Sequence, residues 1–166
     1  MRPLTIRMLS DLADFADHDA VGTIACENFS GLKTGAYAWV TGNARCFPRM
    51  QYFVAELDGE ILGYVLWMEK GGYRDESVWE LEQIAVKGGF KDKGIGTLLI
   101  KESLRHIRKY LAARGSWLKI VEVTTGTENE AQRLYRKTLG AEVEATVKDL
   151  FRGDEVIMIA RFSKPG

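Results

Sequence analysis

The sequence predicts an α/β fold with a mixed, mostly antiparallel central sheet flanked by helices. An Asp-Gly pair stands between two apolar runs, which is typical of a β-hairpin. Farther along, a strand pattern, a glycine-rich segment, a helical pattern and a second strand pattern follow one another, as in a crossover between parallel strands. Two more strand patterns follow a second helical pattern. Hairpins combined with two crossover helices indicate helices on both faces of the sheet.

Length and composition indicate one globular domain over residues 1–166. Apolar residues make up 46% of the chain and charged residues 28%, which is ordinary for a globular protein. The chain is too short for two full-sized domains. Its 23 basic residues balance 23 acidic ones, and this zero net charge argues against a nucleic-acid partner, which would need a basic excess.

The compartment expected from the sequence is the cytoplasm. The first residues carry acids early and lack a long apolar run, so we expect no signal peptide. No apolar run approaches the roughly 20 residues that a membrane helix needs, so no membrane association is expected. Two cysteines, Cys26 and Cys46, are too few for a disulfide framework and favour a reducing environment.

The first half of the chain predicts a strand, a helix, a long loop and three further strands. Ser10 is an expected N-cap, and the helix contains Gly22. Asp58-Gly59 predicts a type I′ turn, since both central residues of that turn need positive φ. The expected elements are a strand at 4–9, a helix at 11–28, a loop at 30–50 with room for a short helix, and strands at 51–57, 60–68 and 77–86.

The second half predicts two helices and three strands. Gly115 and Gly140 follow the two helical patterns and are expected to end them. The strands on either side of the first helix should be parallel, which would open a cleft at their carboxyl ends. The expected elements are helices at 97–113 and 128–139 and strands at 117–125, 141–151 and 154–162.

The segment 86–97 joins a predicted strand to a predicted helix and favours an anion. Backbone amides at a helix start lack partners, and the helix dipole adds positive potential. Gly94 and Gly96 allow close approach of the backbone, and Lys91 and Lys93 add charge. Phosphate or pyrophosphate fits this pattern, with a solvated glycine-rich connection as the alternative. Nucleotide-triphosphatase and dinucleotide-binding loops fit poorly, because their lysine or third glycine is missing.

This segment resembles the acetyl-CoA signature of the GNAT (GCN5-related N-acetyltransferase) superfamily. That signature reads Arg/Gln-x-x-Gly-x-Gly/Ala and follows a strand ending in apolar-Ala-Val, and here Lys91-Asp92-Lys93-Gly94-Ile95-Gly96 follows Gln83-Ile84-Ala85-Val86. The resemblance covers roughly residues 50–162. Lys91 stands where the family usually has Arg or Gln, and Asp92 where it usually has Gly, and both changes would weaken the hold on a diphosphate.

A second matching segment is Ala131-Gln132-Arg133-Leu134-Tyr135, which resembles the family's second conserved helix. The family's Asn is offset by one residue, so either Glu128 or Asn129 would face the pantetheine arm, or the helix start is irregular. In the family this arm lies between two splayed parallel strands. The cofactor-binding residues that the resemblance implies are Ile84, Ala85, Val86, Lys91, Asp92, Lys93, Gly94, Ile95, Gly96, Thr97, Asn129 and Tyr135.

The resemblance implies direct transfer of an acetyl group from acetyl-CoA to a primary amine, without a metal. Tyr135 corresponds to the family's frequent general acid, and backbone N–H groups around Ala85 and Val86 could stabilise the oxyanion. The base stays open among Glu80, Glu82 and Glu122, of which Glu82 and Glu122 are the leading candidates. His18 and His106 have no partner at a catalytic spacing and are expected at the surface.

The acceptor is expected to be a small-molecule or peptide amine. Candidate walls of its pocket are Tyr37, Trp39, Phe47 and Tyr73, and an acidic set would favour a cationic acceptor, namely Asp75, Glu76, Glu80 and Glu82. A homodimer stays open. The alternatives to a transferase are a GNAT-like module that binds acyl-CoA with little catalysis, and a structural protein without a cofactor.

Overall fold

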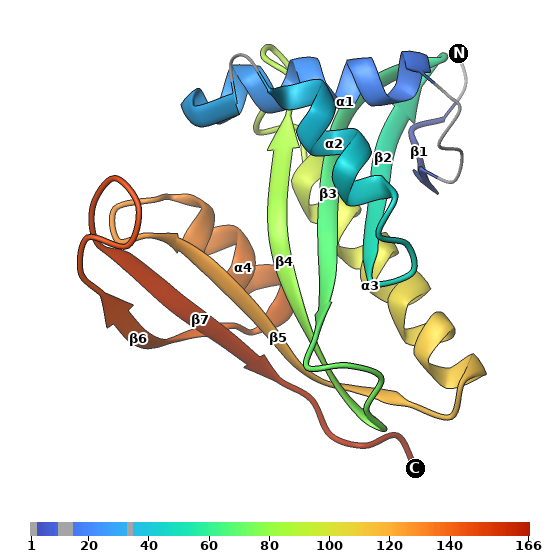
Figure 1. Ribbon diagram of the computed structural model, residues 1–166, viewed down its shortest axis with the longest axis vertical. Coiled ribbons are helices and arrows are strands. Elements are labelled where there is room, and N and C mark those ends of the chain that lie inside the picture. Colours follow the sequence, from blue (N-terminus) through green and yellow to red (C-terminus); the bar gives the residue numbers. More distant parts are fainter. Residues whose placement is uncertain (1–2, 10–14, 33–34) are drawn as a thin grey trace. The chain divides into compact units, whose positions relative to one another are not determined.

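The computed structural model of the protein describes residues 3–9, 15–32 and 35–166, and Figure 1 follows them along the chain. The strands are hydrogen-bonded in the order β1-β2-β3-β4-β5-β7-β6. The elements are β1 (Thr5–Met8), α1 (Phe15–Asn28), the 3-10 helix η1 (Ser30–Leu32), α2 (Ala36–Ala44), β2 (Met50–Leu57), β3 (Glu60–Lys70), β4 (Glu76–Val86), α3 (Ile95–Ala113), β5 (Trp117–Gly126), α4 (Ala131–Leu139), β6 (Glu142–Val147) and β7 (Glu155–Arg161).

The predicted mixed sheet is confirmed. Strands β4 and β5 pair in parallel, as the strand–helix–strand pattern indicated. The pairs β1–β2, β5–β7 and β6–β7 are antiparallel. The parallel ladder ends at Glu80 and Glu122, although both strands continue beyond those residues.

Several expected boundaries change. The segment 30–50, expected as a loop with room for a short helix, contains the short helices η1 and α2. The last helix begins at Ala131 instead of 128, with Glu130 as its N-cap. Just before it, Asn129 Oδ1 accepts a hydrogen bond from the Ala131 amide (2.9 Å). The expected cap Ser10 lies outside the described residues. His18 was expected at the surface and is in fact 1% exposed.

The chain divides into two compact units. Unit 1 comprises Met1–Trp67 and Gln83–Leu104, and unit 2 comprises Met68–Glu82 and Arg105–Gly166. Strands β3 and β4 and helix α3 therefore each contribute residues to both units.

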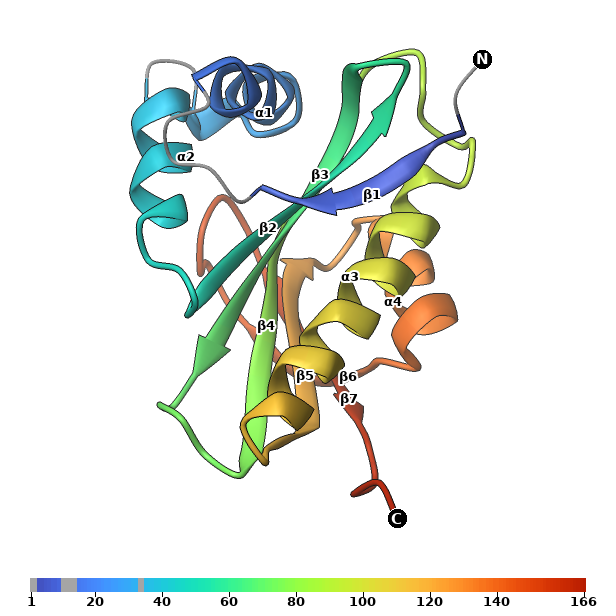
Figure 2. The ribbon, with the colours of Figure 1, turned by 90° about the vertical axis from the view of Figure 1, so that its right-hand side faces the viewer.

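In unit 1, the first half of α3 covers one face of β3 (Figure 2). The Trp67 indole Nε1 donates to Ser103 Oγ (2.8 Å), and Ser103 in turn donates to the Leu99 carbonyl (2.6 Å). All three of these residues are fully buried. The indole is thus satisfied inside the core, as a buried polar group requires.

The hairpin between β2 and β3 contains the turn that the sequence predicts. Asp58 has φ 51° and Gly59 has φ 87°, the two positive values that a type I′ turn needs. A few residues on, Gly63 lets β3 and β4 approach closely, since a Cβ at this position would lie 2.9 Å from the Ala85 carbonyl oxygen. This contact sets the backbone of β4 just before its end at Val86.

In unit 2, a polar network joins β3, β4 and Arg114, the residue that follows α3. The guanidinium of Arg114 donates from both terminal nitrogens to Glu69, which is 2% exposed. Glu69 also accepts from Ser77 Oγ (2.7 Å), and Ser77 accepts from the Trp79 indole (2.9 Å). The network pins the start of β4 to the end of β3 and leaves the opposite face of both strands for other side chains.

Replacing Gly63 by alanine tests the close approach of β3 and β4. The added methyl group would meet backbone, which cannot move aside as a side chain can, so we expect Gly63→Ala to lose about 1–3 kcal/mol of unfolding free energy in urea. Gly42→Ala in α2 is the control, because a Cβ there meets nothing within 4 Å and alanine favours helices. Equal stability of both variants would show that β3 and β4 do not need the glycine.

Candidate functional site

The loop between β4 and α3 curves through three residues with left-handed backbone. Gly89 has φ 81°, Asp92 has φ 61° and Gly94 has φ 81°. The Phe90 amide donates to the Lys87 carbonyl (3.1 Å), which closes the first turn of the loop. The loop therefore arrives at the helix in a conformation that glycine adopts without strain and other residues adopt rarely.

Asp92 stands where the acetyl-CoA signature usually has glycine, and the backbone conformation at this position explains that preference. With φ at 61°, position 92 is left-handed, and aspartate is among the few residues with a Cβ that tolerate this region. The loop thus keeps its shape with Asp92 in place. The cost is a negative charge within the anion-binding segment that the sequence predicts.

Helix α3 begins at Ile95, two residues earlier than the pattern indicated. Its first backbone bond runs from the Leu98 amide to the Gly94 carbonyl (3.0 Å), so the amides of Ile95, Gly96 and Thr97 have no carbonyl one turn back within the helix. Lys91 is exposed, and Lys93 holds its Nζ 4.9 Å from the centre of the Phe90 ring. Free amides, the helix dipole and two lysines together suit an anion.

At the end of β4, the backbone offers one further donor. The Lys87 amide donates to the Leu62 carbonyl in β3 (2.8 Å). Because successive amides of a strand point to opposite edges, the Val86 amide points away from β3. Asn28 Nδ2 lies 3.4 Å from the Val86 carbonyl and holds this strand end against α1.

In unit 2, Lys70 brings two of the candidate carboxylates together. Glu80 and Glu122 are opposite each other in the parallel ladder. The Lys70 Nζ lies 3.1 Å from Glu80 Oε2 and donates to Glu122 Oε1 at 2.9 Å. Burial acts to lower the pKa of Lys70, but the hydrogen bonds to Glu122 and Glu80 outweigh it and the pKa is raised. Lys70 therefore stays charged and holds both carboxylates, offsetting one of their two negative charges.

Glu82 shares the face of β4 that carries Glu80 and differs from it in its surroundings. Burial raises the pKa of Glu82, the charge of Glu80 raises it further, and Lys70 acts to lower it. No ion pair of Glu82 is present among the residues described. A carboxylate with a raised pKa and no counter-ion is the better proton acceptor of the three.

Tyr135 lies on α4 and is 6% exposed. Burial raises its pKa to about 12, so the hydroxyl keeps its proton at neutral pH. Within the described part of the chain, no hydrogen bond uses this hydroxyl, which leaves it free to donate. Asn129, in contrast, uses its side-chain oxygen to accept from the Ala131 amide, and Glu128 lies in the exposed turn before it.

Sequence reasoning missed Lys70. The sequence indicates this lysine only indirectly. Strand alternation places Glu80 and Glu82 on one face of β4, and two carboxylates so close together are stabilised by a nearby cation. Ion pairs also reduce the number of acidic residues that remain available to attract a cationic acceptor. Glu80 pairs with Lys70 and Glu76 with Lys119, which leaves Asp75 and Glu82 without ion pairs in the ranges that the structure describes.

The aromatic residues expected to line an acceptor pocket are exposed. Tyr37 and Trp39 lie on α2 and Phe47 follows it, all in unit 1. Tyr73 lies in unit 2, in the connection between β3 and β4.

Among the described residues, no group of three or more His, Cys, Asp or Glu side chains could hold a metal ion. In that same part of the chain, every helix is too short or too polar to span a membrane.

A family model decides the classification. The model of the Acetyltransferase (GNAT) family matches residues 18–141. The chain belongs to this family. The match includes most of α1, all of α2 to α4, the loop at 86–97 and every candidate base, so the GNAT resemblance and its fold are confirmed.

Relatives and solved structures agree with the assignment. The chain is 33% identical over 105 residues to the uncharacterized N-acetyltransferase MJ1207 of Methanocaldococcus jannaschii, a match that covers 61% of this chain and 43% of that protein. In fold it is similar to Ard1 from Thermoplasma volcanium (TM-score 0.75, 18% identity, 97% and 99% of the two chains). It is equally similar to an aminoglycoside 6'-N-acetyltransferase complexed with coenzyme A (TM-score 0.75, 14% identity, 98% and 99%).

Removing the Lys70 cation should destabilise unit 2 in a pH-dependent way. Lys70→Met leaves two facing, half-buried carboxylates without a counter-ion, and we expect a loss of about 1–2 kcal/mol at pH 7. The penalty comes from repulsion between two carboxylates, so it should be present at pH 7 and smaller in acid, where carboxylates in general begin to take up protons.

Urea unfolding of wild type and variant at pH 7 and pH 4 measures this difference. Lys119→Met is the matched control, because the Lys119–Glu76 pair is exposed and should matter little at either pH. A Lys70→Met penalty that is the same at both pH values would contradict the electrostatic explanation.

Proposed function

We propose that the protein transfers an acetyl group from acetyl-CoA to a primary amine by direct attack, as a single domain over residues 1–166 working in the cytoplasm. The family assignment supports this, and the observation that carries it is the loop from Val86 to Ile95. Three left-handed residues deliver the chain to a helix whose first amides are free, where a diphosphate would bind.

The donor would be held mainly by backbone. The amides of Ile95, Gly96 and Thr97 would donate to the diphosphate, with Lys91 contributing a charge near it. The ladder between β4 and β5 ends at Glu80 and Glu122. The pantetheine arm would lie along the end of β4, next to Ile84 and Ala85.

Glu82 would serve as the base. An alkylammonium has a pKa near 10.4, so the acceptor must lose a proton before its nitrogen can attack. Glu82 can take that proton directly or through one water, whereas Glu80 and Glu122 are engaged by Lys70. The nitrogen then forms a bond to the thioester carbon as the carbon–sulfur bond breaks.

Two donors would assist the charge that develops during transfer. The Val86 amide, which points away from β3, can stabilise the negative thioester oxygen. Tyr135 can give its proton to the departing thiolate, which leaves coenzyme A as the thiol and the acceptor as an acetamide. After attack the nitrogen still carries one proton too many, and this second proton returns to Tyr135 and restores its phenol. The net products are the acetamide, the thiol of coenzyme A and one proton taken up by Glu82.

A second candidate is a module that binds acyl-CoA and catalyses little. The negative charge of Asp92 in the loop, and a lysine in place of Arg or Gln at 91, favour this alternative. Both candidates require the cofactor to bind, and they differ in turnover.

Thiol release from acetyl-CoA with a panel of amines, measured beside calorimetric binding of CoA, separates the candidates. We expect binding and turnover with wild type. Tyr135→Phe should bind CoA normally and turn over about 10²-fold more slowly, the low end of general acid catalysis. Binding without turnover on any amine would favour the module, and no binding would reject both proposals.

The pH profile of kcat/KM identifies the base. Glu82 must be deprotonated, so activity should fall as the pH drops through its raised pKa, and Glu82→Gln should lose about 10²–10⁴-fold. Because Glu80 raises that pKa and Lys70 lowers it, Glu80→Gln should move the acid limb to lower pH and Lys70→Met to higher pH.

One acceptor is used for all variants, so that its own titration is constant across the profiles. Shifts in opposite directions support Glu82 as the base. An acid limb that stays in place in both variants, or that moves the same way in both, would assign the base to another group.

A further inference from the structure

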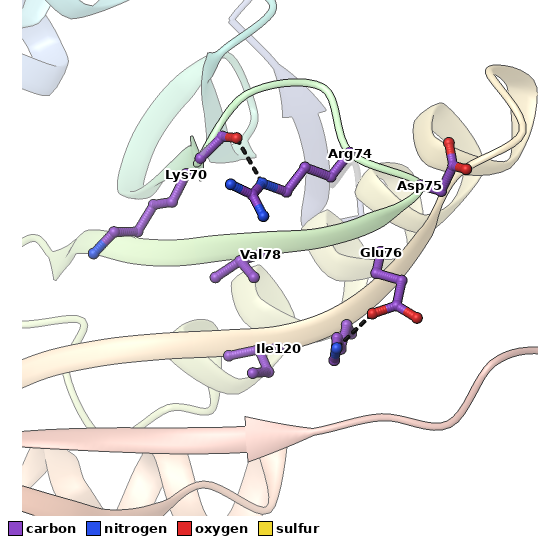
Figure 3. Close-up of a pocket in the computed structure, with 8 residues that line it drawn as sticks. Lys70, Arg74, Asp75, Glu76, Val78 and Ile120 are labelled. Carbon is purple, nitrogen blue, oxygen red and sulfur yellow. Dashed lines mark hydrogen bonds and ion pairs between the residues drawn. The ribbon is translucent and has the colours of Figure 1, made fainter.

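A groove of about 650 Å³ opens in unit 2 beside the lysine–carboxylate cluster (Figure 3). Its residues come from the end of β3 and its connection to β4, and from the starts of β4 and β5. Val78 and Ile120 lie side by side between the two strands and give it an apolar floor. Its volume is within the range of small-molecule sites.

Three cations line the groove, and carboxylates engage two of them. Lys70 bonds to Glu80 and Glu122, and Lys119 pairs with Glu76.

Arg74, unlike Lys70 and Lys119, forms no ion pair among the described residues. Its Nε donates to the Gly71 carbonyl (2.8 Å), which holds the guanidinium over the groove. Its two terminal nitrogens have no partner in the described part of the chain. The carboxylate of Asp75 points away from Val78 and Ile120 in Figure 3.

This arrangement selects a particular anion. A guanidinium fork with both terminal nitrogens available matches a carboxylate, which it can bind through two parallel hydrogen bonds. A phosphate dianion would suit the groove less, because Asp75 and Glu76 also line it and Lys70 is already engaged by Glu80 and Glu122. The apolar floor favours small aliphatic groups next to the carboxylate.

The groove and the proposed base lie on the same face of β4. Val78 and Glu82 are four residues apart, and a strand rises about 3.3 Å per residue, which places them about 13 Å apart. An extended peptide covers that distance with about four residues. An acceptor whose amine is at Glu82 could therefore place a carboxylate in the groove if it is elongated.

We propose that the groove binds the non-reacting end of the acceptor, and that this end is a carboxylate about four extended residues from the acetylated amine. The inference rests on the proposed transferase function. Arg74 is the residue that recognises the carboxylate, Val78 and Ile120 contact the adjoining aliphatic part, and Lys70 separates the groove from the base.

Alanine peptides of two to six residues test the proposal, each with a free carboxylate and as the C-terminal amide. We expect the lowest KM near four residues, and at that length a KM about tenfold lower for the acid than for the amide. Arg74→Gln should abolish the difference and Arg74→Lys should restore part of it. Arg133→Gln, an exposed arginine on α4, is the control and should change neither KM.

A second measurement separates this proposal from the proposed activity. Methyl NMR signals of Val78 and Ile120 are followed while the tetraalanine acid or amide is added without acetyl-CoA. Acid-selective shifts that Arg74→Gln removes support the groove even if no amine is acetylated. Equal KM values for acid and amide at every length, or a preference that survives Arg74→Gln, would overturn it.

Discussion

The start of α3 is the constraint on which the rest of the structure depends. A helix cannot satisfy its own first amides, and here those of Ile95, Gly96 and Thr97 follow a loop that three left-handed residues shape. The loop in turn depends on where β4 ends. That end is fixed by the close approach of β3 at Gly63 and by the contact of Asn28 with the Val86 carbonyl. Core packing thus determines where the free amides at the start of α3 lie, and these amides are suited to bind an anion.

Alternation along β4 explains how one strand can serve both stability and chemistry. Ser77, Trp79 and Leu81 are buried, and the indole and hydroxyl among them are satisfied by a network that ends at Glu69 and Arg114. The intervening Glu80 and Glu82 are half-buried on the other face. Lys70 neutralises Glu80, and Glu82 keeps a raised pKa. Different surroundings for two carboxylates two residues apart are what acid–base chemistry needs.

Local signals predicted those parts of the fold that local physics determines. The Asp58-Gly59 turn, the parallel pair β4–β5 and the helix end at Gly140 each follow from a conformational preference visible in the sequence. Helix α4 begins at Ala131 rather than 128, since its N-cap is Glu130. The bounds of α2 could not be predicted within the loop at 30–50, because Gly35 at its start gives no side-chain cap. Lys70 lies 10 residues from Glu80 and 52 from Glu122, so its ion pairs could not be predicted from neighbouring residues. The burial of His18 could not be predicted in this way either, because it depends on distant elements.

Amide NMR during a titration with CoA tests the central claim most directly. The signals of Ile95, Gly96 and Thr97 should shift with CoA and stay unchanged with pantetheine, which lacks the diphosphate. Binding of CoA that leaves these three amides unperturbed, or equal shifts with pantetheine, would contradict the account.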